Sequence, residues 1–155
     1  MNIDVTSLQQ LFDYWCKKLR IIPCWDVRLE FVDDVSWNKT GDIKIDCDTK
    51  KAIVLINRVN PKYENLEEVL VHELFHLKLY PLDQVTESLL SSHYKEGTPE
   101  YEFVSDQFFL SLEQTVEELA KCFLLEFGEN KELSFKNCQN RKSFNELFDG
   151  LKSLK

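Results

Sequence analysis

Glycine and proline are scarce in this chain of 155 residues, with only four of each. No segment repeats another, and no low-complexity tract or glycine-rich linker interrupts the sequence. A chain of this length with 43% hydrophobic residues suits one compact domain with its own core. We expect an α+β domain at residues 1–127, followed at 128–155 by a polar loop and an amphipathic helix that pack on the same domain.

Paired cysteines are absent as well. The chain has an odd number of cysteines, and none forms a CxxC pair; they stand at positions 16, 24, 47, 122 and 138. This pattern fits reduced thiols better than a disulfide framework or a cysteine-rich zinc site. We expect reduced thiols that serve as packing residues.

Long apolar runs and basic stretches are also missing. Nowhere do 18 consecutive apolar residues occur, and the amino terminus lacks a basic region followed by an apolar run. The net charge is −8 and the acids are spread along the chain, which disfavours binding to a phosphate backbone. We therefore expect a soluble, cytoplasmic protein without a nucleic-acid or membrane partner.

The first half of the chain changes from helical to strand periodicity. A helix is predicted over 6–20, with Asp4 or Thr6 as N-cap, by the spacing of Leu8, Leu11, Phe12, Trp15 and Leu19. Alternating or continuous apolar residues then predict strands at 27–31, 43–45 and 52–56. Turn residues between them favour short connections and a mostly antiparallel three-stranded sheet.

The second half is predominantly helical. Asn65 is the predicted N-cap of a helix over 66–79, which Pro81 should end. A short helix at 83–92, a loop at 95–99 and a long helix over 104–127 capped by Gly128 should follow. The final amphipathic stretch is predicted from Phe144, Leu147, Phe148 and Leu151.

The most informative motif is His72-Glu73-Leu74-Phe75-His76, an HExxH pattern within the predicted helix 66–79. Positions i and i+4 share one face of a helix, so both imidazoles can be directed at one metal ion. Glu73 is rotated about 100° from His72, which places its carboxylate beside the metal, where a general base is needed. The motif predicts a catalytic zinc site with His72 and His76 as ligands and Glu73 as base.

A catalytic zinc needs a third protein ligand. Glu113 and Glu117 share a face one turn apart on the predicted helix 104–127, so one can bind the metal while the other orients a histidine. His93 is the remaining histidine and stands in a polar context. We expect Glu113 as ligand, with Glu117 as the alternative and His93 and Glu100 next in line.

These elements together resemble the gluzincin clan of zinc metallopeptidases over about residues 5–127. In size the chain is similar to the minigluzincins and to small metallopeptidases predicted in bacteria and their phages. In larger gluzincins an aspartate four residues after the ligand glutamate orients a histidine, and Glu113 and Glu117 have that spacing. Some membrane gluzincins instead carry Glu-x-x-Ala, which aligns with Glu117 and Ala120 and implies Glu117 as ligand. The segment from Gly97 to Glu100 resembles the Gly-Thr-x-Asp element of aspartate-liganded zincins.

The resemblance implies a zincin-like fold and a zinc-dependent endopeptidase that acts on peptides or proteins. Zincins commonly bind substrate as an added strand at the sheet edge beside the active-site helix, and we expect residues 52–56 to form that edge. Tyr80, Tyr94 and Tyr101 are the candidate oxyanion donors. Two rival hypotheses stay open: a zinc-stabilised regulatory or binding module with His93 or Glu100 as fourth ligand, and a metal-free interaction protein.

Overall fold

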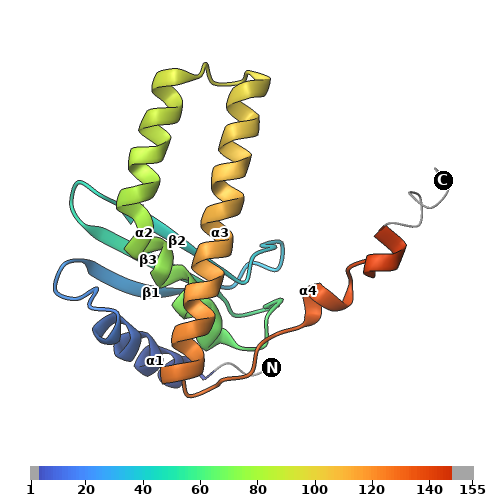
Figure 1. The fold of residues 1–155 in the computed structure, drawn as a ribbon. Helices are drawn as coiled ribbons and strands as arrows, with labels where there is room; N and C mark the ends of the chain where they lie inside the picture. Colours follow the sequence, from blue (N-terminus) through green and yellow to red (C-terminus); the bar gives the residue numbers. More distant parts are fainter. Residues whose placement is uncertain (1–3, 148–155) are drawn as a thin grey trace.

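The computed structural model describes residues 4–147, apart from the side chains of residues 136 and 137. Three strands and four helices follow in the order α1 (Val5–Lys18), β1 (Asp26–Val32), β2 (Gly41–Asp46), β3 (Lys51–Asn57), α2 (Leu66–His93), α3 (Pro99–Phe127) and α4 (Lys136–Gln139). The predicted α+β class is confirmed. Figure 1 shows that α2 and α3 run side by side in opposite directions and extend beyond the sheet.

Helix α1 begins at the predicted N-cap, because the Asp4 side chain accepts a hydrogen bond from the backbone N–H of Thr6. Its fully buried Trp15 donates from Nε1 to Oε1 of Glu67 at 2.8 Å. The same Glu67 carboxylate accepts from the backbone N–H groups of Glu129 and Asn130. One buried carboxylate thus ties α1, α2 and the segment after α3 together, as charge-assisted hydrogen bonds to backbone N–H groups can do.

The three predicted strands are present, but their arrangement corrects the prediction. The strand order is β1-β3-β2, in which β1 pairs with β3 in parallel and β2 pairs with β3 in antiparallel fashion. The sheet is therefore mixed, not mostly antiparallel. The connection between β1 and β2, residues 33–40, is long enough to carry the chain past the position that β3 then fills.

The centre of the sheet is β3, the strand with the most continuous apolar run. Its residues Ala52, Val54 and Ile56 are buried in the core formed with α1, α2 and α3. Because β3 is paired on both sides, the prediction that residues 52–56 form a free edge beside the active-site helix is wrong. The edge strand on that side is β2, which contacts α2.

Helix α2 continues through Pro81 to His93, so the predicted end near residue 79 and the separate helix at 83–92 are wrong. A proline in a helix interior costs about 3 kcal/mol or more. We attribute the continuation to the packing of α2 along α3, which begins at Pro99, five residues earlier than predicted. The predicted loop at 95–99 is confirmed as the turn between them, although Pro99 already belongs to α3. We call residues 81–112 the helical arm.

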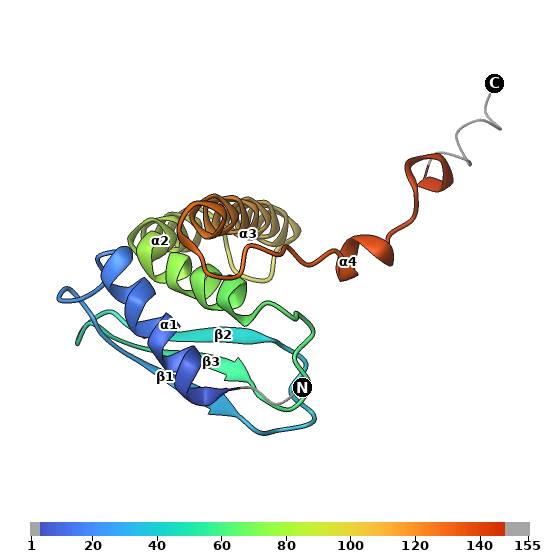
Figure 2. The ribbon, with the colours of Figure 1, turned by 90° about the horizontal axis from the view of Figure 1, so that it is seen from below.

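The cysteine prediction is confirmed in one respect and wrong in another. All five cysteines are free thiols, yet only Cys16 is buried, so the other four are not packing residues. The segment directly after α3 is bonded to α2, and from α4 on the described chain leads away from the helices and sheet (Figure 2). Phe144 and Leu147 are 75% and 62% exposed, whereas Phe148 and Leu151 lie outside the described residues. No helix among the described residues is long and apolar enough to cross a membrane.

Candidate metal centre

The HExxH motif lies on α2, as predicted. The helix begins at Asn65, whose side-chain oxygen accepts from the backbone N–H groups of Glu67 and Glu68. Buried apolar residues then hold α2 against the core; they are Val69, Leu70, Val71, Leu74, Phe75 and Leu77. The opposite face carries His72 and His76, one turn apart and each partly buried. Both imidazoles reach Glu113 of α3.

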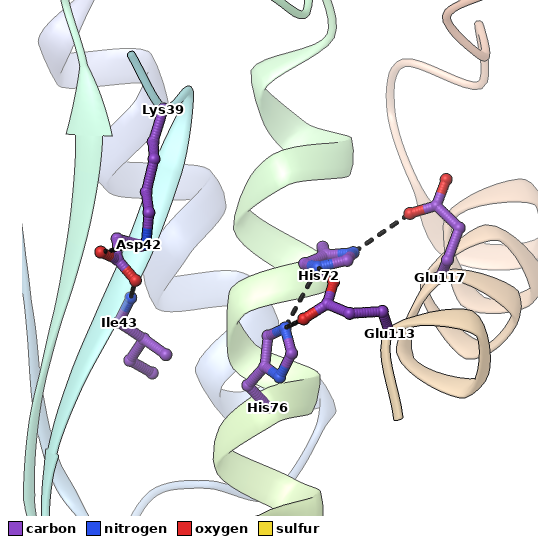
Figure 3. A network of polar contacts seen from close by, with 7 residues as sticks. All are labelled: Lys39, Asp42, Ile43, His72, His76, Glu113 and Glu117. Carbon is purple, nitrogen blue, oxygen red and sulfur yellow. Dashed lines mark hydrogen bonds and ion pairs between the residues drawn. The ribbon is translucent and has the colours of Figure 1, made fainter. Parts of the chain in front are cut away.

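Glu113 of α3 completes a group of three possible ligands. His72 Nε2 and His76 Nε2 are 3.2 Å apart, and the two Glu113 oxygens lie 3.5 Å from His72 Nε2 and 3.3 Å from His76 Nε2. Figure 3 shows the three side chains pointing toward one another from α2 and α3. Two donors of a tetrahedral site with bonds of about 2.0–2.1 Å stand roughly 3.3 Å apart. The His72, His76 and Glu113 group could thus hold a metal ion of this size.

Glu117 lies on the other side of His72. Its Oε2 is 3.1 Å from His72 Nδ1, and its Oε1 accepts from Lys121 Nζ at 2.8 Å. With the proton of His72 on Nδ1 and donated to Glu117, the lone pair of Nε2 faces His76 and Glu113. Both Glu117 oxygens are therefore engaged away from the three-donor group.

Glu73 is 8% exposed and lies at the point where α2 passes the start of β2. A Cβ at Gly41 would stand 2.5 Å from Val69 Cγ1 and 2.8 Å from Glu73 Oε1, so the close approach requires glycine. Burial raises the pKa of Glu73 to about 7, against the opposing effect of His72. Its carboxyl can thus both accept and release a proton near neutral pH.

The pKa values of His72 and of its neighbours shift in opposite directions. Burial alone would lower the pKa of His72, but hydrogen bonds with Glu113 and Glu117 outweigh it and raise that pKa to about 9. The hydrogen bond with His72, helped by Lys121, lowers the pKa of Glu117 to about 2. In contrast, burial lowers the pKa of His76. Without a metal, His72 is therefore the protonated member of the group at neutral pH.

Two clefts flank the group, and both are lined by His72, Glu73, Glu113 and the start of β2. The cleft of about 450 Å³ extends along β2 towards the helical arm, past Ile43, Ile45, Phe109 and Leu112. The cleft of about 370 Å³ extends towards the start of α2, past Asn38, Thr40 and Lys62. The three-donor group thus stands in the middle of a groove of size suited to small ligands or peptide side chains.

Other residues predicted for the site lie elsewhere. His93 is 17 residues beyond His76 on α2, which corresponds to about 25 Å, and its Nδ1 contacts the carbonyl oxygen of Leu89. Glu100 is exposed near the start of α3, about 20 Å along the helix from Glu113. Tyr94 and Tyr101 lie at the tip of the helical arm, so of the three tyrosines only Tyr80 lines the cleft.

The sequence analysis missed Gly41, Lys39, Asp83 and Lys121. Lys121 follows Glu117 by four residues, a helical ion-pair spacing that is visible in the sequence. Lys39 lines both clefts and pairs with Asp42 at 2.8 Å. No sequence pattern around Gly41 or Asp83 indicates their roles, because those roles depend on which helix packs against which strand.

The geometry of the site comes from the structure of this chain alone. Comparison with protein-family models, with curated proteins and with solved structures gave no match.

Proposed function

We propose that the protein is a zinc-dependent metallopeptidase with His72, His76 and Glu113 as zinc ligands. The observation that carries this proposal is the mutual spacing of 3.2–3.5 Å among the three donors, with a buried carboxyl, Glu73, beside them in an open cleft. Two histidines and one carboxylate form a donor set that zinc prefers at catalytic sites. Among the described residues, no fourth protein ligand joins this group.

Bound zinc would polarise a peptide carbonyl and lower the pKa of a water molecule. The Glu73 carboxylate would accept a proton from that water and return it to the nitrogen of the leaving amine. A pKa near 7 suits both transfers at neutral pH. Tyr80 lines the same cleft, and burial raises the pKa of its hydroxyl, which stays protonated and able to donate a hydrogen bond to an oxyanion.

Glu117 would position His72 and thereby support zinc binding. Its contact with His72 Nδ1 fixes the tautomer that leaves Nε2 for the metal. This division of labour between Glu113 and Glu117, four residues apart, supports the resemblance to gluzincins with glutamate in the place of the orienting aspartate. It disfavours the Glu-x-x-Ala alignment, in which Glu117 would be the ligand.

The substrate would bind as an extended peptide along β2. This strand is hydrogen-bonded to β3 on one side only, and its residues Gly41, Ile43 and Ile45 line the cleft beside the histidines. A free strand edge offers N–H and C=O groups to a peptide backbone. The groove is open on both sides of the donor group, which favours internal peptide bonds over chain ends.

The test combines metal analysis with peptide hydrolysis. Protein purified without chelators should carry about one zinc per chain, and a mixture of unstructured peptides should be cleaved. The Glu73→Gln variant should keep its zinc and lose about two to four orders of magnitude in rate. Stoichiometric zinc without hydrolysis would favour a zinc-stabilised binding module, and folded protein that takes up no zinc would refute the metal site.

A further inference from the structure

The two sides of the cleft differ in chemistry. Towards the helical arm, the cleft is walled by Ile43 and Ile45 of β2 on one side and by Phe109 and Leu112 of α3 on the other. Phe109 is 45% exposed although it faces a cleft. An apolar wall of this kind gains free energy by covering itself with an apolar side chain, about 25 cal/mol per Å² buried.

Asp83 adds a charge to the same side. It follows His76 by seven residues, two turns of α2, so it shares the face that carries the histidines, about 10 Å further along. Its Oδ1 is buried and has no hydrogen-bond partner among the described residues. A buried carboxylate oxygen without a partner is costly, and a cationic group in the cleft would remove that cost.

The helical arm adds further negative charge to that of Asp83. Within residues 81–112 the chain has six acids, at positions 83, 87, 96, 100, 102 and 106, against one base, Lys95. The arm therefore attracts cations towards the end of the cleft where Asp83 lies. Apolar walls, a carboxylate with one buried and unpartnered oxygen, and an acidic arm all fit one occupant, an apolar segment with a basic group further out.

The direction of the peptide follows from β2. Antiparallel pairs are slightly more stable and more frequent than parallel ones, so a peptide on the free edge should run against β2. Followed from its amino terminus, such a peptide would pass Ile45 before it reaches Gly41. The Glu73 carboxyl lies beside Gly41. The arm side of the cleft thus receives the residues that precede the scissile bond.

We propose that this cleft selects peptides with a large apolar side chain just before the scissile bond and a basic side chain about three residues further towards the amino terminus. The spacing follows from the 10 Å between His76 and Asp83 and a rise of about 3.3 Å per extended residue. This inference rests on the proposed peptidase function, whose substrate class it names.

The test uses three peptides of ten residues. The parent peptide has leucine before the expected bond and lysine three residues before that leucine, in an alanine-serine background. One relative replaces leucine by aspartate, and the other replaces lysine by glutamate. Mass spectrometry of the products locates the cut in the zinc-loaded protein, and fluorescence anisotropy measures binding to the Glu73→Gln variant.

The parent peptide should be cut after leucine. Replacing leucine should weaken binding and kcat/KM at least tenfold. Replacing lysine should weaken both severalfold, with an effect that shrinks at high salt.

Variants of the protein assign each preference to its residue. Phe109→Ala should reduce the preference for leucine, and Asp83→Asn should abolish the preference for lysine. The matched controls are Phe103→Ala on the same arm and Glu118→Gln on α3, because both side chains are exposed and line neither cleft. Both controls should keep the two preferences of the parent.

The outcomes separate the two proposals. Cleavage without these preferences, or with leucine after the cut, would overturn the selectivity and leave the peptidase function standing. Selective binding without cleavage would overturn the peptidase function and leave the peptide preference standing. If neither these peptides nor the mixture of unstructured peptides is bound or cleaved, both are wrong. If Phe109→Ala lowers the mass of the particle in sedimentation and leaves peptide binding unchanged, the apolar wall belongs to a second copy of the chain instead.

Discussion

His72 and Glu117 are joined through Nδ1 of the imidazole and Oε2 of the carboxylate, 3.1 Å apart, on the side of the ring that faces away from His76. Glu113, one turn earlier on α3, meets the other nitrogen of the same ring. Two acids of the same type, four residues apart, thus contact opposite sides of one histidine. Their different positions predict different consequences of substitution.

Glu113→Gln should remove most zinc binding, because it takes one anionic donor from a three-ligand site. Glu117→Gln should keep zinc binding but lower the affinity about 10–100-fold, as expected when a group that orients a ligating histidine is changed. Titration of zinc into each variant and into the parent measures the zinc affinities. Glu118→Gln, an exposed neighbour on α3, is the matched control. The reverse order of effects would make Glu117 the ligand.

Gly41→Ala should disturb the site through packing alone. The new Cβ would meet Val69 Cγ1 at 2.5 Å and Glu73 Oε1 at 2.8 Å, so β2 or the Glu73 side chain must shift. We expect a loss of about 1–3 kcal/mol in the free energy of unfolding and a fall in peptidase rate, with zinc affinity changed much less. Urea denaturation and zinc titration measure the two effects. An alanine variant with the stability and rate of the parent would show that α2 and β2 are further apart than described.

The metal-free protein should become less stable as the pH rises from about 5 to 9. The pKa of His72 is about 9 in the folded state against an ordinary 6.5, so its stabilising contribution is complete below 6.5 and is lost as the pH rises through 9. The pKa of Glu73, raised to about 7 from 4.5, acts in the same direction between 4.5 and 7 and outweighs the lowered pKa of His76, which acts in the opposite direction below 6.5. The total loss should be on the order of 3 kcal/mol, since the two groups are coupled.

Urea denaturation in the presence of a chelator at pH 5.5, 7 and 9 tests this. His72→Gln should remove the part of the slope above pH 7. With saturating zinc, stability should rise up to about pH 6.5 and then level off, because zinc binding displaces the proton from His72. A metal-free stability that is constant from pH 5.5 to 9 would contradict the raised pKa values.

The cysteines should divide into one protected and four reactive thiols. Cys16 is fully buried, and burial, together with the charge of Asp13, raises the pKa of its thiol to about 12. Since the thiolate is the reactive form, Cys16 should react with maleimide orders of magnitude more slowly than the exposed cysteines. Peptide mass spectrometry after brief labelling, with and without urea, measures this. Rapid labelling of Cys16 in the folded protein would place α1 away from the core.

The sequence by itself determined the parts that depend on neighbours along the chain. The N-caps Asp4 and Asn65, the presence of three strands and the placement of His72, Glu73 and His76 on one helix all follow from spacing of a few residues. The pairing of Glu113 and Glu117 on one helical face is equally local. These features needed no knowledge of what packs against them, because helical and strand periodicity already place the side chains.

Only the tertiary structure decided the features that depend on long-range packing. The position of β3 between β1 and β2 depends on how the connection at 33–40 crosses the sheet. Helix α2 continues past Pro81 because α3 packs alongside it. No local sequence pattern indicates the free energy of that packing. In the same way, the approach of α3 to α2 places Glu113 at the histidines and Glu117 behind one of them, and the approach of β2 to α2 requires Gly41 beside Glu73. Periodicity states which face of an element is buried, but the identity of its neighbour is set by the packing of the whole chain.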